Sequence, residues 1–195
     1  PSFSTTGADL LVDQAPTVPV AVIDMDFDLD HPEMKGVYDL SLSKDFSGHS
    51  FKRMTDWSGD VQHGGMSSAL IGANGFDQAG TTGVSKKSRI IALNISQFDS
   101  TPINLSEVIK YAVDAGARVI NCSIGIENPT VDELKALREG VEYAADHDVV
   151  IVASAGNWGV DNDQNEFYPA NFSREFKNVI SVGASTRRDQ VWKHS

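Results

Sequence analysis

Three residue types that can assist a nucleophile in hydrolysing an acyl bond stand at well-defined places in this chain of 195 residues. Asp24 ends the apolar run VAVID, His63 begins the small-residue stretch HGGMSSALIGA, and Asn157 follows VVIVASAG. A carboxylate can orient an imidazole, the imidazole can take a proton from a nucleophile, and a carboxamide can donate to the oxyanion that forms. Each residue alone also fits an ordinary strand end, helix start or turn. The pattern therefore favours acyl transfer only if the three side chains converge.

The elements that must position these residues alternate between apolar runs and helical patterns. We predict strands at residues 18–24, 89–95, 118–123, 149–154 and 179–182, and helices at 63–74, 104–115 and about 130–147. This alternation predicts an α/β fold, namely a three-layer, mostly parallel, doubly wound sheet with helices on both faces. The β-branched strand at 149–154 is expected to be covered on both faces. The length and the 41% hydrophobic content favour a single domain over 1–195.

Polar residues predict where two of the helices begin and end. Asn104 with Glu107 three residues later is an Asx variant of the capping box, and Gly116 should end the helix that follows. Thr130 with Glu133 forms a second capping box. Both helices are therefore expected to start at a side-chain cap.

A binding site is expected at one edge of the predicted sheet. In parallel sheets, ligands bind beyond the carboxyl ends of the strands, and Asp24, Ser123 and Asn157 all lie at such ends. The exit from the strand at 118–123 could also pair with an extended peptide through main-chain hydrogen bonds. The sequence therefore predicts a peptide-binding edge next to the candidate chemical groups.

The order and spacing of the motifs resemble the catalytic domain of the subtilisin-like (S8-type) serine proteases. VAVID at 20–24 is followed by HP at 31–32, HGGMSSALIGA at 63–73, GVSKKSRIIALNI at 83–95, ARVINCSIG at 117–125, VVIVASAGNWG at 149–159, and YPANF and NVISVGAS within 168–185. The resemblance spans about 18–195, from the family's Asp to just short of its Ser.

The resemblance implies a serine endopeptidase that acts on peptide or protein substrates. Asp24 would be the acid of the catalytic triad, His63 the general base and Asn157 the oxyanion donor. The cleft for the side chain before the scissile bond would be lined by Ser123, Ile124, Gly125, Ser154, Ala155 and Gly156, with residues 168–170 behind it. No cofactor would be required. Structural calcium is compatible with the acidic loops 36–62 and 158–166, although no ligand residues can be identified from their spacing.

Several positions depart from the family's pattern. The family's D-[ST]-G is here Asp24–Met25–Asp26, and a second carboxylate facing the site would raise the pKa of one of the pair. We expect Asp26 to point to solvent or to a cation instead. Met66 replaces a second, structural histidine, and Trp158 stands where a smaller polar residue is common. Trp158 would narrow the cleft or form an aromatic wall.

The segment that should carry the nucleophile does not occur before Ser195, which itself lacks the GTSM-like context. We therefore expect this chain alone to be inactive. It would be one chain of a cleaved enzyme, an excised fragment, or a degenerate homologue. An uncovered core should make it unstable or associated with the remaining C-terminal part of the protease domain.

Other functions compete with this interpretation. A catalytically dead, peptide-binding or scaffolding subunit would keep the fold without the Ser. The run VIDMDFD also matches DxD phosphatases that use Mg²⁺, with Asp24 as nucleophile, but that reading leaves HGGMSSALIGA and VASAGN unexplained. An EF-hand loop fails because Leu29 and Lys35 occupy the positions that need Gly and Glu.

Composition excludes some partners. A net charge of −11 argues against nucleic acid and anionic membranes, and no apolar stretch is long enough to span a bilayer. The single cysteine, Cys122, lies in an apolar run and is expected to be a buried structural thiol. The resemblance favours a secreted or extracytoplasmic location.

Overall fold

The computed structural model describes residues 17–47, 62–75, 82–85, 87–95 and 104–195. The chain divides into two compact units, Pro1–Ile103 and Asn104–Ser195, and each is described by itself. The expectation of one domain over 1–195 stays a prediction.

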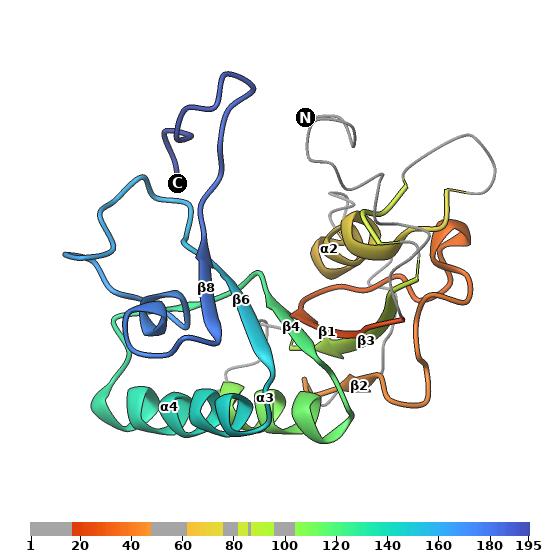
Figure 1. Cartoon of the computed structure of the whole chain (residues 1–195), viewed down its shortest axis with the longest axis horizontal. Coiled ribbons are helices and arrows are strands. Elements are labelled where there is room, and N and C mark those ends of the chain that lie inside the picture. The colour runs from red at the N-terminus through yellow and green to blue at the C-terminus, as the bar shows by residue number, and fades with distance from the viewer. Residues whose placement is uncertain (1–16, 48–61, 76–81, 86, 96–103) are drawn as a thin grey trace. The chain divides into compact units, whose positions relative to one another are not determined.

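The first unit is built on three parallel strands. Their order is β2, β3, β1, and their bounds are Lys44–Asp45 (β2), Arg89–Asn94 (β3) and Pro19–Asp24 (β1). Helix α2, His63–Gly72, packs against β1 and β3, and the short 3₁₀ helix η2 spans Pro32–Met34 (Figure 1). The strands and the helix that we predicted in this half are confirmed. The continuous apolar runs, such as VAVI, form buried strands at β1 and β3.

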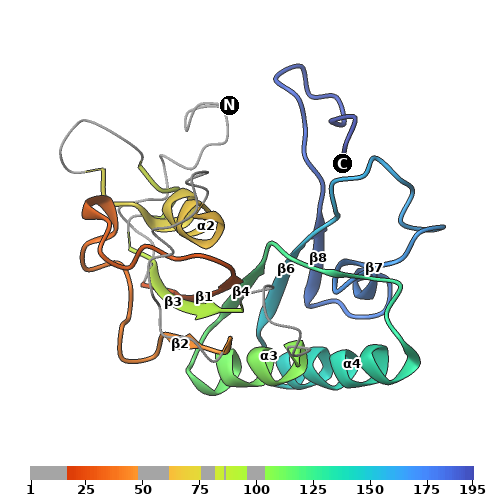
Figure 2. The ribbon, with the colours of Figure 1, turned by 180° about the vertical axis from the view of Figure 1, so that it is seen from behind.

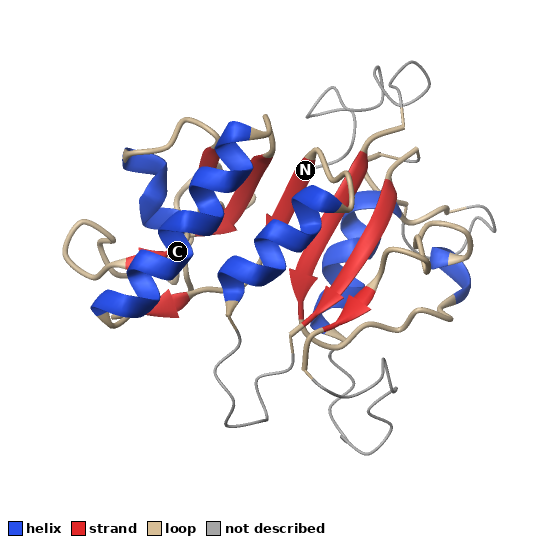
Figure 3. Cartoon of the chain, turned by 90° about the horizontal axis from the view of Figure 1, so that it is seen from below, coloured by secondary structure: helices blue, strands red, loops and turns tan. Residues whose placement is uncertain are grey.

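The second unit is built on three further parallel strands and two helices. The strand order is β4, β6, β8, with bounds Val119–Cys122 (β4), Val150–Ser154 (β6) and Val179–Val182 (β8). Helices α3, Leu105–Asp114, and α4, Val131–Asp146, pack on each other along one side of these strands (Figures 1 and 3). The antiparallel pair β5, Ile126–Glu127, and β7, Phe167–Tyr168, precedes the 3₁₀ helix η3, Ala170–Arg174 (Figure 2).

One of the two predicted helix caps forms. The Thr130 hydroxyl accepts from the Glu133 N–H at 3.2 Å, and the Glu133 carboxylate accepts from the Thr130 N–H at 2.7 Å, which completes the capping box of α4. The predicted Asn104 side-chain cap of α3 is wrong. Thr130 has an extended backbone with ψ 162°, whereas Asn104 has ψ 89°. The Glu107 N–H donates to the backbone carbonyl of Asn104 at 2.9 Å and not to its side chain. Gly116, with φ 84°, follows α3 as predicted.

The sheet of the second unit has one covered face and one open face. Ile151 and Ala153 of β6 are buried, as is Cys122 of β4, which confirms the buried thiol. On the opposite face, Ile180 and Val182 of β8 are 49% and 47% exposed. The residues of β6 on this opposite face, Val150, Val152 and Ser154, are only half-buried, so the expectation that both faces of β6 are covered is not met within the described part of the chain.

Candidate active site

The first unit brings Asp24 and His63 into direct contact. Asp24 is the last residue of β1 and is fully buried, whereas His63 is the first residue of α2 and exposes 43% of its side-chain surface. Nδ1 of His63 lies 2.6 Å from Oδ1 of Asp24. The carboxylate can only accept, so Nδ1 carries the hydrogen and Nε2 is left free to exchange protons with another group. This is the geometry of a histidine oriented by an acid.

The loop that follows β1 determines where α2 begins. The carbonyl of Met25 accepts from the Gly64 N–H at 2.6 Å, and the carbonyl of Asp26 accepts from the Gly65 N–H at 3.2 Å. These bonds satisfy donors that have no partner within the first turn of a helix. A Cβ atom on Gly64 would lie 2.7 Å from the Phe27 ring and 2.8 Å from the Met25 carbonyl oxygen. Glycine at this position therefore allows the close approach that places His63 beside Asp24.

A third side chain, which the sequence analysis missed, completes the surroundings of Asp24. The Ser67 hydroxyl donates to Oδ2 of Asp24 at 3.0 Å, and the Met25 N–H donates to Oδ1 at 2.7 Å. Ser67 lies four residues after His63, so both side chains project from the same face of α2. The four-residue spacing can be read from the sequence, but the contact of Ser67 with Asp24 cannot.

The electrostatics of Asp24 balance burial against these contacts. Burial raises the pKa of the Asp24 carboxyl, and it outweighs the Met25 N–H, the interaction with His63 and the Ser67 hydroxyl, which all lower that pKa. Asp26 is not one of the groups that shift it. The Asp24 carboxyl is therefore buried and yet hydrogen-bonded at both oxygens.

Asp26 takes part in bracing the site through its backbone. It has a left-handed backbone, with φ 56°, at the position where the family's pattern has glycine. Its N–H donates to the Asn94 side-chain oxygen at 3.2 Å, and the Asn94 amide donates to Asp45 at 2.9 Å. Asn94 pairs with Asp24 in the register of β3 and β1. It ties together the carboxyl ends of the strands in this unit, a role that sequence reasoning did not identify.

Asn157 lies in the second unit, in the loop after β6. Its side chain is exposed. The loop is held by polar contacts: Asn162 donates to the Ala155 carbonyl at 2.9 Å, and Asn171 donates to the Asn162 carbonyl at 2.7 Å. The predicted role of Asn157 as an oxyanion donor stays a prediction.

The predicted substrate-binding residues leave two neighbouring strands at the same edge. Cys122, the last residue of β4, pairs with Ala153 of β6. Residues 123–125 and 154–156 therefore begin side by side. Among them, Ser123 accepts from the Asn121 amide at 2.9 Å, and Ser154 accepts from the Gly156 N–H at 3.2 Å. Ile124 and Ala155 are half-buried. The structure thus gathers these six residues, and their function stays a prediction.

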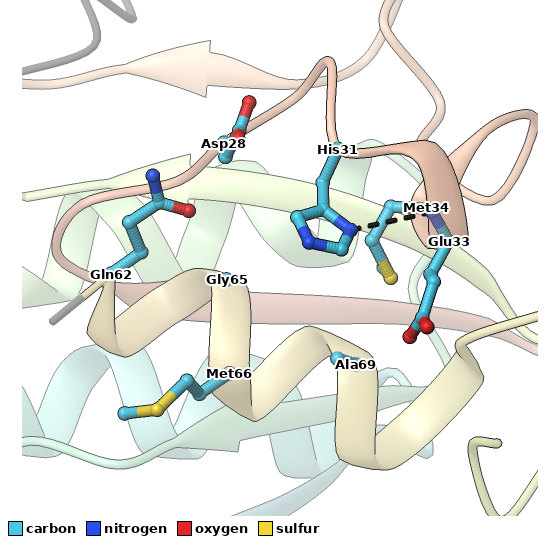
Figure 4. A pocket seen from close by; sticks show the side chains of 8 residues that line it. All are labelled: Asp28, His31, Glu33, Met34, Gln62, Gly65, Met66 and Ala69. Carbon is cyan, nitrogen blue, oxygen red and sulfur yellow. Dashed lines mark hydrogen bonds between the residues drawn. The ribbon is translucent and has the colours of Figure 1, made fainter. Parts of the chain in front are cut away.

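A pocket of about 360 Å³ lies on the first unit, between α2 and η2 (Figure 4). Its lining includes Asp28, His31, Glu33 and Gln62, and Nδ1 of His31 accepts from the Glu33 N–H at 3.3 Å. Met66, at the position of the family's second histidine, is exposed and points away from His31 in Figure 4. Within the described ranges, no three His, Cys, Asp or Glu side chains are grouped so that they could hold a metal ion. The implied structural calcium stays a prediction.

A family model and several known proteins match most of the chain. The model of the subtilase family (Peptidase S8) matches residues 16–195. The thermophilic serine proteinase of Bacillus sp. (strain AK1) is 31% identical over 175 residues, which are 88% of this chain and 39% of that protein. The cell wall-associated protease of Bacillus subtilis (strain 168) is 33% identical over 176 residues, 88% of this chain and 18% of that protein.

A solved structure shows the same fold. The epidermin leader peptide processing serine protease from Staphylococcus aureus has a TM-score of 0.73 and 22% identity, and the match covers 93% of this chain and 50% of that one. The predicted α/β class, with its mostly parallel sheet in three layers, is thereby confirmed. The chain spans half or less of the length of each of these three proteins.

Proposed function

Because the chain belongs to the subtilase family, we propose that it forms the larger part of the catalytic domain of a serine endopeptidase. The observation that carries the proposal is the 2.6 Å contact between Nδ1 of His63 and the buried Asp24 carboxylate. It leaves Nε2 of a half-exposed imidazole as the proton acceptor. A neutral imidazole held in this way is suited to general base catalysis near neutral pH.

The proposed reaction begins with a serine that lies outside these residues. Its Oγ forms a bond to the scissile carbonyl carbon, its proton passes to Nε2 of His63, and the carbonyl electrons move to the oxygen. Asn157 donates a hydrogen bond to that oxyanion. The carbon–nitrogen bond then breaks, and the leaving amine takes the proton from His63. Water repeats the sequence on the acyl-enzyme and releases the second product.

In this mechanism Asp24 stays ionised and fixes the imidazole. The hydrogen bonds from Met25 and Ser67 hold both carboxylate oxygens, so the carboxylate has little freedom to rotate. This orientation matters because the wrong tautomer of the histidine would present a hydrogen, not a lone pair, to the serine. Ser67 is accordingly proposed as a positioning residue for the Asp–His pair.

The substrate is proposed to be an extended peptide that lies antiparallel to residues 123–125. The main chain there leaves β4 before β5 begins, and β5 itself pairs with β7. Main-chain hydrogen bonds would then provide affinity that does not depend on the peptide's sequence. The side chain before the scissile bond would lie between residues 123–125 and 154–156.

The nucleophile is proposed to reside in a C-terminal segment that packs on this chain. Support comes from the open face of the second unit's sheet, where Ile180 and Val182 are exposed beside the half-buried Val152. The chain also spans only 39% and 18% of its two relatives. Covering such a face is favourable by about 25 cal/mol per Å² of apolar surface. The covering segment would complete both the core and the triad.

The DxD phosphatase alternative is disfavoured by the environment of Asp24. A phosphatase nucleophile needs an accessible carboxylate oxygen for attack on phosphorus and for Mg²⁺. Asp24 is fully buried, and its two oxygens accept from His63, Met25 and Ser67. The peptide-binding subunit without catalysis remains the competing function.

We also propose an extracytoplasmic location, in keeping with the cell wall-associated relative. Across the part of the chain that the structure describes, no helix has both the length and the apolar character to cross a bilayer. Fractionation of the source cells would check the location.

A fluorophosphonate probe tests the proposed function. It should label the protein that contains the covering segment when that protein is folded, and heat-unfolded protein should remain unlabelled because labelling requires an activated serine. Labelling of a serine outside residues 1–195 would support the peptidase. Folded, full-length protein that takes up no label would instead establish the binding subunit.

A further inference from the structure

An aromatic ring occupies the space between the two predicted substrate-binding segments. Phe167, the first residue of β7, lies against the backbone of Gly125, where a Cβ atom would overlap ring atoms Cζ, Cε1 and Cε2. A Cβ atom on Gly156 would lie 3.6 Å from another atom of this ring, Cδ1. Gly125 and Gly156 belong to the two segments, so the ring fills the gap between them.

Several contacts hold this ring in place. Phe167 is 5% exposed and packs with the buried residues Ala153 and Ala170. Its N–H donates to the Asn171 side chain at 3.2 Å, and Glu127 of β5 is its partner in the antiparallel ladder. Hydrogen bonds therefore fix the backbone of Phe167. The ring cannot leave the gap without breaking the β5–β7 pair or the apolar cluster.

A second aromatic side chain lies over the first. The Trp158 ring meets the Phe167 ring edge-on, with centroids 5.3 Å apart. Cζ3 of Trp158 would be 2.8 Å from a Cβ atom on Gly156, so the indole also covers the backbone of that segment. Trp158 is 53% exposed and can swing away at lower cost than Phe167. Phe167 is therefore the buried ring at the bottom of the gap, and Trp158 is the exposed ring beside it.

This gap is where the proposed function would put one substrate side chain. Asn157 follows Gly156 directly, so a carbonyl that accepts from Asn157 belongs to a residue lying beside 154–156. An extended peptide paired with residues 123–125 would then direct that residue's side chain between the two segments. The space available there sets which side chains the enzyme accepts.

We propose that Phe167, with Trp158, restricts the enzyme to substrates with a small side chain, such as Gly, Ala or Ser, before the scissile bond. This inference rests on the proposed function and names its substrate class. A bulky residue would have to displace a buried phenyl ring, whereas a methyl or hydroxymethyl group needs far less room. Phe167 and Trp158 are accordingly specificity-determining residues that do not take part in proton transfer.

The test uses the full-length protein and peptides that differ only in the residue before the scissile bond. The wild-type enzyme should have kcat/KM at least about tenfold higher for Ala than for Phe at that position. Phe167→Ala should shift this ratio toward Phe by about 10- to 200-fold, the range expected when a pocket gains or loses apolar volume. Trp158→Ala should shift it in the same direction by less. Phe176→Ala, which truncates a half-buried phenylalanine after η3, should leave the ratio unchanged.

The ratio of two substrates on one preparation does not depend on how much of a variant is folded, so destabilisation by Phe167→Ala cannot mimic the result. A wild-type preference for Phe or Leu, or an unchanged ratio in Phe167→Ala, overturns the inference while the peptidase stands. Failure to cleave any peptide, together with no fluorophosphonate labelling, overturns the peptidase and this inference with it.

Discussion

The two units differ in how firmly contacts within each unit hold the side chains that we propose to be catalytic. In the first unit, Asp24 is buried, bonded at both oxygens and in contact with His63, all through residues of β1, its following loop and α2. In the second, Asn157 is exposed and the sheet keeps an apolar face open. The acid–base pair is organised by contacts within the first unit, whereas the residues proposed to bind substrate lie in a unit whose sheet has an exposed apolar face.

The largest loss of activity should come from removing the proposed general base of the first unit, His63. His63→Ala in the full-length protein should lower kcat by about four orders of magnitude or more, because no other group would accept the serine's proton. The fold should survive, since the side chain is half exposed. Single-turnover kinetics and circular dichroism check both statements. Retention of wild-type turnover by a folded variant would remove His63 from the mechanism.

The next effect concerns the exposed unit. Asn157→Ala should lower kcat by about 10²- to 10³-fold and change KM little, because the bond to the oxyanion forms only in the transition state. Steady-state kinetics on one peptide separates the two constants. If only KM rises, Asn157 contacts the substrate but does not stabilise the oxyanion.

A change in packing sharpens the comparison without touching a reacting group. Gly64→Ala should lower the free energy of unfolding by about 1–3 kcal/mol, because the added Cβ meets the Phe27 ring and the Met25 carbonyl. Gly65→Ala is the matched control, since its nearest contact would be the Cβ atom of Gln62 at 3.2 Å, a looser contact than those of 2.7 and 2.8 Å at Gly64. Urea denaturation of both variants measures the difference. Equal stabilities would show that close packing at Gly64 does not position α2.

A smaller loss of activity is expected when the hydrogen bond from Ser67 to Asp24 is removed. Ser67→Ala should lower kcat several-fold and raise the pKa of Asp24 further, because one hydrogen bond of about 1 kcal/mol is lost from the carboxylate. Ser68→Ala, a buried neighbour on α2, is the control. Carbon-detected NMR of the Asp24 carboxyl group follows the titration. No movement of that pKa in Ser67→Ala would make the contact incidental.

The pH dependence of stability offers the finest test. Burial raises the pKa of Asp24 above its ordinary value of 3.8, so the folded state keeps this proton to a higher pH than the unfolded state does. As pH rises from about 4 through the folded pKa, this group therefore makes folding less favourable. Wild type should lose stability relative to Asp24→Asn over that interval, as measured by denaturation at a series of pH values. The opposite slope would mean that the contacts outweigh burial.

Much of the fold could be predicted because its signals are local. Continuous apolar runs identified β1, β3 and β8, and a serine- or threonine-type cap with glutamate three residues later identified the start of α4 at Thr130. The cap at Asn104 failed because the side chain's reach depends on a backbone angle that residue type alone does not set.

The site was harder to predict in full. Asp24 and His63 follow from strand and helix ends, so their contact could be anticipated. Ser67, Asn94 and Phe167 act through tertiary contacts between distant segments, and nothing in composition or spacing required them. Uncovered core surface was expected, but its position on β6 and β8 was not, since a β-branched strand has the same sequence pattern whether one face is covered or two.

The backbone bonds that start α2 have a practical consequence. The amide hydrogens of Gly64 and Gly65 are held by carbonyls of the loop after β1, and they can exchange with deuterium only when that loop releases the helix. Their exchange rates would report how firmly the acid and base are held together. This spectroscopic signal needs neither substrate nor serine, so it can be read even in protein that cuts nothing.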